Sequence, residues 1–452
     1  MPNAPGRSRS PGHAPAPPRT VSRSRRRRTA GAAVILVAAG TLAACGGDSG
    51  GTPTLTWYIN PDSGGQAEIA SRCTDAAEGA YEISTEVLPR DAAGQREQLI
   101  RRLAAEDSSI DLMSLDPPFI PEFAEAGFLA DVPDDLADRV TEGVVESAIQ
   151  GSTWNDEIVA VPFWANTQIL WYRKSVAEAA GLDMTQPVTW DQIIQAAQDQ
   201  DVQISAQGAR AESLTVWLNA LIESAGGHII DENSDDPEQI ELGLDSDAGR
   251  RAAEVMRAVA DSGQVSPAFS TENEDAGADE FQGDNGGFHV NYPYVWPRGN
   301  TAVAAGTLDQ SVVDDYGWTI WPRVDADTPV APPYGGINLG VGAYSEHADL
   351  AFDAAECIVS EENQAYYFVS NGNPAALSSV YDDQEVVAEF PQAPVIRESL
   401  ELAAPRPQTP YYSEVSGGIQ REYHPPTSVD PDSTPQSATE LIEAVLAGDQ
   451  LL

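Results

Sequence analysis

Three polar side chains, Asn60, Asp62 and Asp116, stand where they could bind a polar ligand through hydrogen bonds. Asn60 and Asp62 follow a stretch with strand composition, residues 54–59, and Asp116 directly follows another, residues 110–115. Carboxylates and amides can take part in several hydrogen bonds at once, which suits a ligand rich in polar groups. The same residue types also form turns by bonding to nearby backbone, so a turn-forming role is the alternative for each of them.

The elements expected to position these side chains are strands that alternate with helices. Residues 54–59, 81–88 and 110–115 have strand composition, and helical patterns cover residues 65–78 and 94–107. This order at this spacing predicts a parallel α/β sheet. Ligands of such sheets bind beyond the carboxyl ends of the strands, so the three side chains should share one rim of the sheet.

Length and charge limit the organisation of the chain and its partners. A chain of 452 residues is longer than one hydrophobic core usually organises, so two lobes are expected. Eight of the 25 basic residues precede residue 45, so the remainder carries 17 basic and 70 acidic residues and a net charge of −53. Such a charge argues against binding to nucleic acid and against adsorption to anionic lipid.

The first 44 residues have the pattern of a bacterial lipoprotein signal peptide. Arginines at 23 and 25–28 precede a short apolar run, residues 30–42, and small residues stand directly before Cys45. Cys45 would then carry the lipid that anchors the protein to the extracytoplasmic face of the cell membrane, with residues 45–53 as a flexible tether. An ordinary secretory signal with an incidental cysteine is the alternative. Initiation at Met1 or Val21, and export by the Sec or the twin-arginine route, all remain open.

Few residues after Cys45 suggest a metal site or an enzyme. Two cysteines, Cys73 and Cys357, are too few for a metal cluster; in an oxidising compartment they would form one disulfide, with two buried thiols as the alternative. The sequence has no zinc-protease helix motif, no phosphate-binding loop and no nucleophile elbow, which needs Gly-x-Ser-x-Gly between a strand and a helix; the five histidines are scattered. We therefore expect neither enzyme activity nor a cofactor; the competing class is a secreted carbohydrate hydrolase that uses a carboxylate pair.

Short stretches spread along the chain resemble, in the same order, the solute-binding proteins of bacterial ABC sugar importers, the group that includes maltose-binding protein. The matching stretches are Trp57-Tyr58-Ile59-Asn60, residues 111–116 and 123–129, Val161-Pro162-Phe163 with residues 166–172, residues 291–296, and residues 335–339. Within that group the chain is most similar to the trehalose-binding lipoproteins of mycobacteria, through residues 166–173, residues 216–227 and the flanks of Cys73 and Cys357.

This resemblance implies a two-lobed α/β fold of the type II periplasmic-binding-protein kind. The N-lobe would comprise residues 54–164 and 318–343, and the C-lobe residues 165–317 and 344–452. Three chain crossings, near residues 163–166, 317–320 and 341–345, would form the hinge. The protein would be a monomer that holds an α-glucoside disaccharide, trehalose first and maltose-type sugars second, and delivers it to ABC permease subunits with a cytoplasmic ATPase.

The resemblance also assigns ligand contacts. Asp116 and Asn166 would bind sugar hydroxyls, with turn-forming roles as the alternative. Glu274 matches a ligand carboxylate, but it stands in an acidic stretch that could simply be solvated. Arg421 matches a sugar-contacting arginine only after a shift in the alignment. Both Cys73 and Cys357 have counterparts in the mycobacterial lipoproteins, which favours a disulfide between them.

Aromatic residues and glycines complete the candidate site. Tyr292 and Tyr294 flank Pro293 after a strand-like run, so either ring could stack on a sugar, with core packing as the alternative. Gly335 and Gly336 would bring backbone groups close to the ligand, and a plain loop is their alternative.

Overall fold

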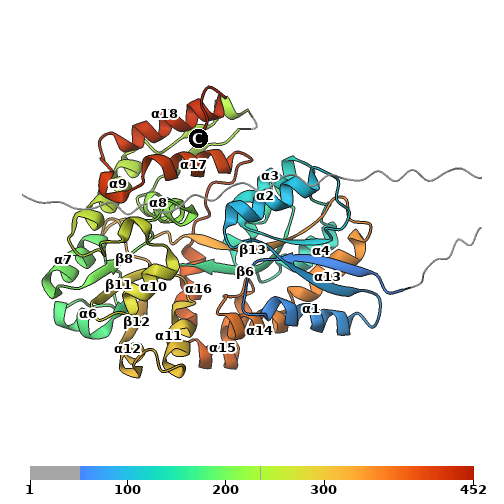
Figure 1. Cartoon of the computed structure of the whole chain (residues 1–452), viewed down its shortest axis with the longest axis horizontal. Helices are drawn as coiled ribbons and strands as arrows, with labels where there is room; N and C mark the ends of the chain where they lie inside the picture. Colours follow the sequence, from blue (N-terminus) through green and yellow to red (C-terminus); the bar gives the residue numbers. More distant parts are fainter. Residues whose placement is uncertain (1–50, 235) are drawn as a thin grey trace, which may run out of the picture. The chain divides into compact units, whose positions relative to one another are not determined.

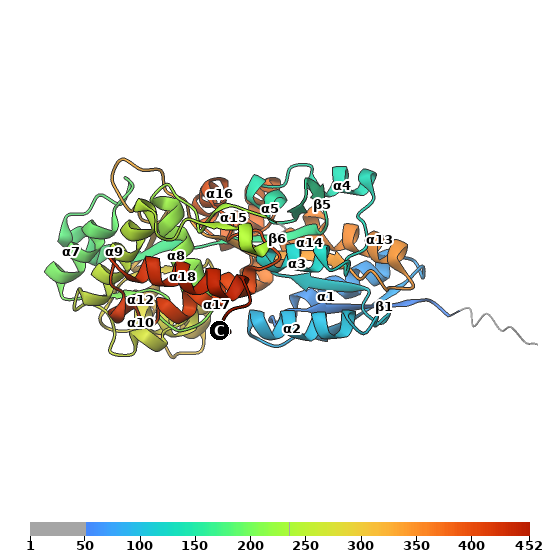
Figure 2. The same cartoon turned by 90° about the horizontal axis from the view of Figure 1, so that it is seen from above.

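The computed structural model describes residues 51–234 and 236–452. The expected signal peptide, Cys45 and most of the tether therefore lie outside the described residues. In the described part of the chain, no helix is both long and apolar enough to cross a membrane. The fold is built on two larger β-sheets, each packed with its own helices (Figures 1 and 2).

The first sheet has five strands in the order β2-β1-β3-β13-β6. Their bounds are Thr54–Ile59 for β1, Glu82–Val87 for β2, Leu112–Leu115 for β3, Val161–Thr167 for β6 and Tyr334–Val341 for β13. β1 pairs in parallel with β2 and β3, which confirms the parallel sheet predicted from the sequence. β13 runs antiparallel to both β3 and β6.

Helices cover both faces of this sheet because its strands carry apolar side chains on both sides. Leu55 and Trp57 of β1 pack into one core, and Tyr58 packs into another. The first core is completed by α1 (Gly65–Ala76), α4 (Asp134–Thr141), α13 (Ala348–Ile358) and α14 (Glu361–Asn371). The second core contains residues of α2 (Ala92–Leu103) and α3 (Ile120–Glu125). We call this sheet with these helices the first lobe.

The second sheet has four strands in the order β12-β7-β11-β8. Their bounds are Ile169–Arg173 for β7, Gln203–Ser205 for β8, Gly286–Asn291 for β11 and Tyr316–Thr319 for β12. The helices that gather with it in Figure 1 are α6 (Lys174–Ala180), α7 (Trp190–Gln200), α8 (Glu212–Ser224), α9 (Asp247–Asp261), α10 (Glu274–Gln282), α11 (Val295–Ala304), α12 (Gln310–Asp314), α17 (Tyr412–Glu422) and α18 (Thr434–Leu446). We call this assembly the second lobe.

Shorter elements complete the fold. They are α5 (Glu146–Gln150), the hairpin of β4 (Thr153–Trp154) and β5 (Glu157–Ile158), the ribbon of β9 (Ile230–Glu232) and β10 (Glu241–Leu242), and helices α15 (Gln384–Glu389) and α16 (Ala393–Leu402). A separate apolar cluster joins α16 to Ala165 of β6 and Tyr334 of β13. This cluster attaches α15 and α16 to the first lobe.

The chain passes between the two sheets later than expected at two of the three crossings. The first crossing, at Gln168 between β6 and β7, lies close to the expected residues 163–166. The second follows Val330, which still packs in the core of the second lobe, and not residues 317–320. The third does not occur at 341–345, because α13 and α14 remain in the first lobe; the chain leaves it between α16 and α17.

The assignment of residues 344–452 to the C-lobe is therefore wrong for α13 to α16, and the assignment of residues 318–330 to the N-lobe is wrong as well. The physical reason is the apolar face of α13, where Ala351, Phe352 and Ala355 complete the core that contains Trp57. A helix with such a face is held where that face can be buried. The remaining lobe boundaries stay a prediction.

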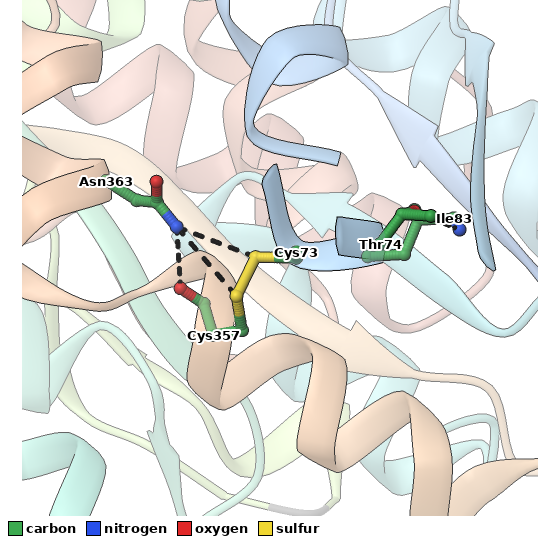
Figure 3. The surroundings of a disulfide bond; sticks show 5 residues. All are labelled: Cys73, Thr74, Ile83, Cys357 and Asn363. Carbon is green, nitrogen blue, oxygen red and sulfur yellow. Dashed lines mark hydrogen bonds between the residues drawn. A yellow bond between two sulfur atoms is a disulfide. The ribbon is translucent and has the colours of Figure 1, made fainter. Parts of the chain in front are cut away.

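A disulfide between Cys73 of α1 and Cys357 of α13 confirms the predicted pairing (Figure 3). The two Cα atoms are 5.8 Å apart, and 284 residues separate the cysteines in the sequence. Asn363 donates a hydrogen bond from Nδ2 to the carbonyl oxygen of Cys357 at 2.9 Å. The disulfide thus joins α1 and α13, two helices that cover the same face of the first sheet.

Candidate functional site

A cavity of about 590 Å³ is lined by residues of both lobes. Seven of the ten predicted ligand-binding residues line it: Asn60, Asp116, Asn166, Glu274, Tyr292, Gly335 and Gly336. Asn60 and Asp116 follow β1 and β3, as the parallel-sheet pattern predicted. Tyr292 follows β11 of the second sheet, and Glu274 begins α10. The polar residues predicted from distant parts of the sequence therefore converge on one space.

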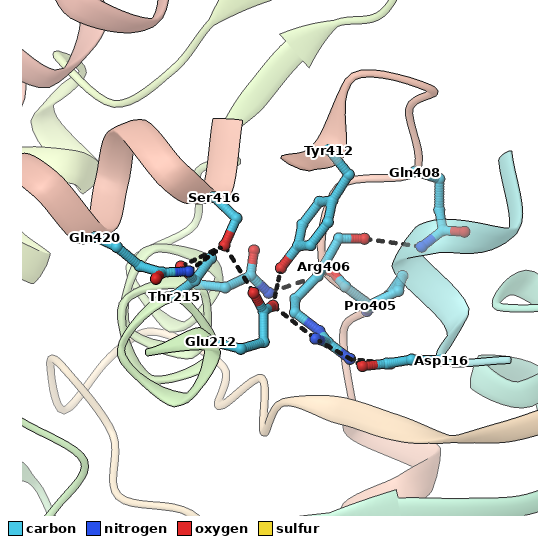
Figure 4. Close-up of polar contacts among 10 residues, drawn as sticks. Asp116, Glu212, Thr215, Pro405, Arg406, Gln408, Tyr412, Ser416 and Gln420 are labelled. Atoms are coloured by element: carbon cyan, nitrogen blue, oxygen red, sulfur yellow. Dashed lines mark hydrogen bonds and ion pairs between the residues drawn. The ribbon is translucent and has the colours of Figure 1, made fainter. Parts of the chain in front are cut away.

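Arg406 connects the two lobes at the wall of this cavity (Figure 4). Its side chain is 5% exposed; Nη2 donates to Oδ1 of Asp116 at 2.5 Å, and Nη1 donates to Oε1 of Glu212 at 2.7 Å. Tyr412 and Ser416 of α17 also donate to Glu212, Ser416 at 2.7 Å. Burial raises the pKa of the Asp116 carboxyl, and the Arg406 guanidinium counteracts that shift. Asp116 is thus held by an ion pair, so its alternative role as a simple turn former does not account for its contacts.

The carboxylate of Glu274 is available to a ligand. Within the described residues, no side chain donates a hydrogen bond to it, although it lines the cavity. Burial raises the pKa of Glu274, and the nearby carboxylates of Asp275 and Glu212 add to the shift. Ligand hydroxyls that donate to this group would replace the solvation that burial removes.

Four residues that line the cavity carry a polar atom that the described residues leave without a partner: Asn60, Trp164, Ser213 and Arg406. Oδ1 of Asn60 accepts no hydrogen bond there, while Nδ2 of the same side chain donates to Gln95 at 2.6 Å. The indole Nε1 of Trp164 likewise has no acceptor among the described groups. Buried polar atoms are nearly always satisfied by protein, water or ligand. Asn60 thus keeps an unused acceptor and Trp164 an unused donor, both buried, in residues that line the cavity.

The two glycines serve different purposes. Gly336 has φ +123°, and a Cβ at that position would lie 2.2 Å from the carbonyl oxygen of Trp164, so only glycine fits there. A Cβ at Gly335 would meet nothing closer than 3.9 Å, the carbonyl oxygen of Asn166. Gly336 is thus needed for the pairing of β13 with β6, whereas the absence of a side chain at Gly335 leaves space in the cavity.

Three predicted ligand residues do not line the cavity. Asp62 accepts hydrogen bonds from the backbone N–H groups of Gly64 and Gln66, at 2.9 and 2.8 Å. These are the bonds of a turn-forming aspartate, the alternative role considered for this residue. The hydroxyl of Tyr294 is 3.4 Å from Nδ2 of Asn291, and burial raises its pKa. Arg421 donates to the carbonyl oxygen of Leu451 at 3.4 Å, at the C-terminal end of the chain. None of the three is among the residues that line the cavity.

Sequence reasoning did not find Arg406, Glu212 or Trp164. Arg406 pairs with Asp116 across 290 residues, so no local pattern connects them. Its local sequence, between Pro405 and Pro407, predicts an extended segment but not a partner for the guanidinium. Among the described residues, no cluster of His, Cys, Asp and Glu is suited to a metal ion.

Two buried ionisable residues lie behind the cavity in the second lobe. Glu272 is 2% exposed and accepts a hydrogen bond from Ser266 at 3.3 Å, and burial raises its pKa to about 8. His289 is fully buried, and burial lowers its pKa to about 4. Between these two values both side chains are uncharged.

Replacing Glu272 with glutamine should stabilise the protein in a pH-dependent way. Folding raises the pKa of Glu272 from 4.5 to about 8, because burial disfavours the charged carboxylate. The free energy of unfolding is therefore highest below pH 4.5, where the carboxyl is neutral in the folded and the unfolded chain, and it falls as the pH rises through about 8. Glu272→Gln is therefore expected to raise the melting temperature by roughly a few degrees near pH 8 and to change it little near pH 4.5. Calorimetric melting at the two pH values measures this, with exposed Glu443→Gln as the control. An equal gain at both pH values would contradict it.

Comparisons with known proteins agree with this architecture. A family model described as bacterial extracellular solute-binding protein matches residues 76–365. A probable ABC transporter-binding protein of Deinococcus radiodurans is 22% identical over 80% of this chain and 84% of its own length. The diacetylchitobiose-binding protein DasA of Streptomyces coelicolor is 23% identical over 75% of this chain and 80% of its own.

Solved structures share the two-lobed fold. Maltose-bound MalE3 of T. maritima superposes with a TM-score of 0.72 at 23% identity, covering 88% of this chain and 100% of that one. The GacH receptor of Streptomyces glaucescens, described in unliganded form and with acarbose, gives a TM-score of 0.70 at 17% identity with the same coverage. The fold is thus the two-lobed, type II periplasmic-binding-protein fold predicted from the sequence.

Proposed function

The chain belongs to the bacterial extracellular solute-binding protein family, and on that premise we propose that it binds a sugar in the cavity lined by both lobes. The observation that carries this proposal is the polar wall itself, where Asp116, Glu274 and Arg406 converge from both lobes. A sugar hydroxyl donates and accepts at the same time, so a mixed set of carboxylate, guanidinium and amide groups suits it. The names of one relative and two structural neighbours in these comparisons, which include diacetylchitobiose, maltose and acarbose, also support a glycoside ligand.

Within that class we propose an α-linked glucose disaccharide, trehalose ahead of maltose. The resemblance to trehalose-binding lipoproteins supports this choice. The volume of the cavity lies in the range of small-molecule sites, and Tyr292 and Trp164 provide aromatic surface beside its polar groups. No observation favours the carbohydrate hydrolase considered as the alternative, and the relatives reported above are binding proteins.

The proposed mechanism is closure of the two lobes around the ligand. A sugar that contacts both lobes binds the closed form more tightly than the open one and so shifts the population toward closure. The closed monomer would then be recognised by membrane permease subunits whose ATPase lies in the cytoplasm, while the lipid on Cys45 keeps the protein at the extracytoplasmic face of the membrane.

Titration calorimetry with trehalose, maltose, sucrose and longer α-glucans tests the proposal. We expect trehalose to bind most tightly, maltose next, and small-angle scattering to show a more compact protein with the bound sugar. Binding to an amino acid, a peptide or a metal ion, with no binding to any of these sugars, would refute the assignment of a sugar ligand. Tight binding without compaction would refute lobe closure.

Asn166→Ala is expected to weaken sugar binding by about 1–3 kcal/mol, the range for a buried polar group left without its partner. The melting temperature should hardly change, because the hydrogen bond that Oδ1 of Asn166 accepts among the described residues is a local one, from the neighbouring N–H of Thr167 at 3.1 Å. Calorimetry and thermal melting measure the two effects, with Asn300→Ala on the exposed surface of α11 as the matched control. Parallel losses of affinity and of stability would instead indicate the turn-forming role.

A further inference from the structure

A hydrogen-bonded chain of three buried residues, Ser205, His289 and Asn291, leads from the second sheet to the wall of the cavity. His289 and Asn291 are two residues apart on β11, so their side chains share one face of the strand, and both are fully buried. Nδ1 of His289 is 3.1 Å from the carbonyl oxygen of Ser205 on β8, and Nε2 is 2.7 Å from Nδ2 of Asn291. Neither His289 nor Asn291 lines the cavity.

The partners of the imidazole determine which nitrogen carries the proton. The carbonyl oxygen of Ser205 can only accept a hydrogen bond, so Nδ1 is protonated and donates to it. Nε2 of the neutral ring then has a free lone pair, which accepts a hydrogen bond from the side-chain amide nitrogen of Asn291. The neutral ring thereby fixes which end of the Asn291 amide faces it.

The same amide holds two residues of the cavity wall. Nδ2 of Asn291 also donates to the carbonyl oxygen of Glu274 at 2.9 Å, and Oδ1 accepts the backbone N–H of Tyr292 at 2.8 Å. If the amide turned over, its nitrogen would face the N–H of Tyr292 and its oxygen would face the carbonyl of Glu274. A donor would then face a donor at Tyr292, and an acceptor would face an acceptor at Glu274. The position of the backbone at both residues therefore depends on the orientation of one amide.

We propose that His289 is a positioning residue of the ligand site, which orients Asn291 and through it holds Glu274 and Tyr292 in place. This inference rests on the proposed function, since it concerns the same cavity. It identifies a contribution to ligand binding from a side chain that the ligand does not touch.

The surroundings of the ring are consistent with a neutral imidazole. The ring of Phe281 stacks on it with 5.7 Å between centroids. A Cβ at Gly277 would lie 2.8 Å from Cε1 of His289 and 3.1 Å from Oε1 of Glu272, so these two side chains meet at Gly277. Glu272 is the ionisable group that faces the ring, with Glu280 near Glu272, and burial raises the pKa of Glu272 to about 8 while it lowers that of His289 to about 4.

Two amide substitutions at this position separate the two hydrogen bonds of the ring. His289→Asn has a nitrogen near the place of Nδ1, so it can still donate to Ser205 but does not reach Asn291. His289→Gln is one bond longer, and its oxygen can take the place of Nε2 and accept from Asn291. Both variants remove the same buried ring, so both should lose a similar amount of thermal stability, which makes each the control for the other.

We expect His289→Asn to weaken trehalose binding, measured by calorimetry, about tenfold, the effect of losing roughly one buried hydrogen bond. His289→Gln should stay within about threefold of the wild-type affinity. Hydrogen exchange of the sugar-free protein, followed by mass spectrometry on a peptide that contains Tyr292, gives a second measurement. Exchange at Tyr292 should be faster in His289→Asn and close to wild type in His289→Gln.

Equal losses in the two variants would overturn the positioning role, because they would show that His289 contributes only packing. A wild-type result for His289→Asn would overturn it as well. If the wild-type protein bound no sugar of the panel, the proposed function would fail. The exchange measurement would still decide whether His289 holds Tyr292, since it needs no ligand.

Discussion

Arg406→Ala is expected to abolish detectable sugar binding and to lower the stability of the fold by about 3–5 kcal/mol, the usual cost of removing one partner of a buried ion pair. Arg406 is 5% exposed and bonds to both Asp116 and Glu212, so its removal leaves two partly buried carboxylates close together without a cation. Burial already raises the pKa of Asp116, and loss of the guanidinium should raise it further.

Denaturant unfolding and calorimetry with trehalose measure the two effects of Arg406→Ala. Arg397→Ala is the matched control, because that arginine pairs with Asp382 at the surface and should contribute no more than about 1 kcal/mol. If the two alanine variants were equally stable, the cluster around Arg406 would not be structurally important. If Arg406→Ala kept the wild-type affinity, the ligand would bind elsewhere.

Removing the disulfide should cost roughly 4–5 kcal/mol of stability, an upper value for a cross-link that closes so long a loop. The double variant Cys73→Ser/Cys357→Ser is expected to melt at a clearly lower temperature than the oxidised wild type. Its sugar affinity should be unchanged, because neither cysteine lines the cavity.

Thermal melting with and without reductant checks the effect of the disulfide. The wild type should lose stability on reduction, and the double serine variant should not respond. Thiol titration of the denatured, unreduced protein without its signal peptide and Cys45 should find no free thiol, and two free thiols per chain would contradict the disulfide.

Local sequence patterns predicted the elements that local burial determines. The strand-like stretches that became β1, β2 and β3 alternate with the helical patterns of α1 and α2. This order places Asn60 and Asp116 at one rim of the sheet, where the cavity lies. The lobe to which α13 belongs could not be predicted in this way. Its apolar face fits either core, and only the packing of Ala351 and Phe352 near Trp57 decides between them.

The charged part of the site was the hardest to predict, because it depends on pairing between distant segments. Arg406 gains its role from Asp116 and Glu212, which lie 290 and 194 residues away in the sequence. The resemblance points to Arg421 only through a shifted alignment, and in the structure Arg421 donates to the carbonyl oxygen of Leu451 and does not line the cavity. An ion pair between distant segments leaves no periodic signal in the sequence, so a single chain without relatives does not reveal it.

The disulfide of the first lobe encloses the whole of the second sheet. All four strands of that sheet, β7, β8, β11 and β12, lie in the sequence between Cys73 and Cys357. The polypeptide from Cys73 to Cys357 is therefore closed into a covalent ring by the disulfide, and this ring contains every strand of the second sheet. A protease that cuts once in any loop between the two cysteines leaves two fragments that remain joined by the disulfide. A single cut in this region therefore does not separate the first lobe from the second until the disulfide is reduced.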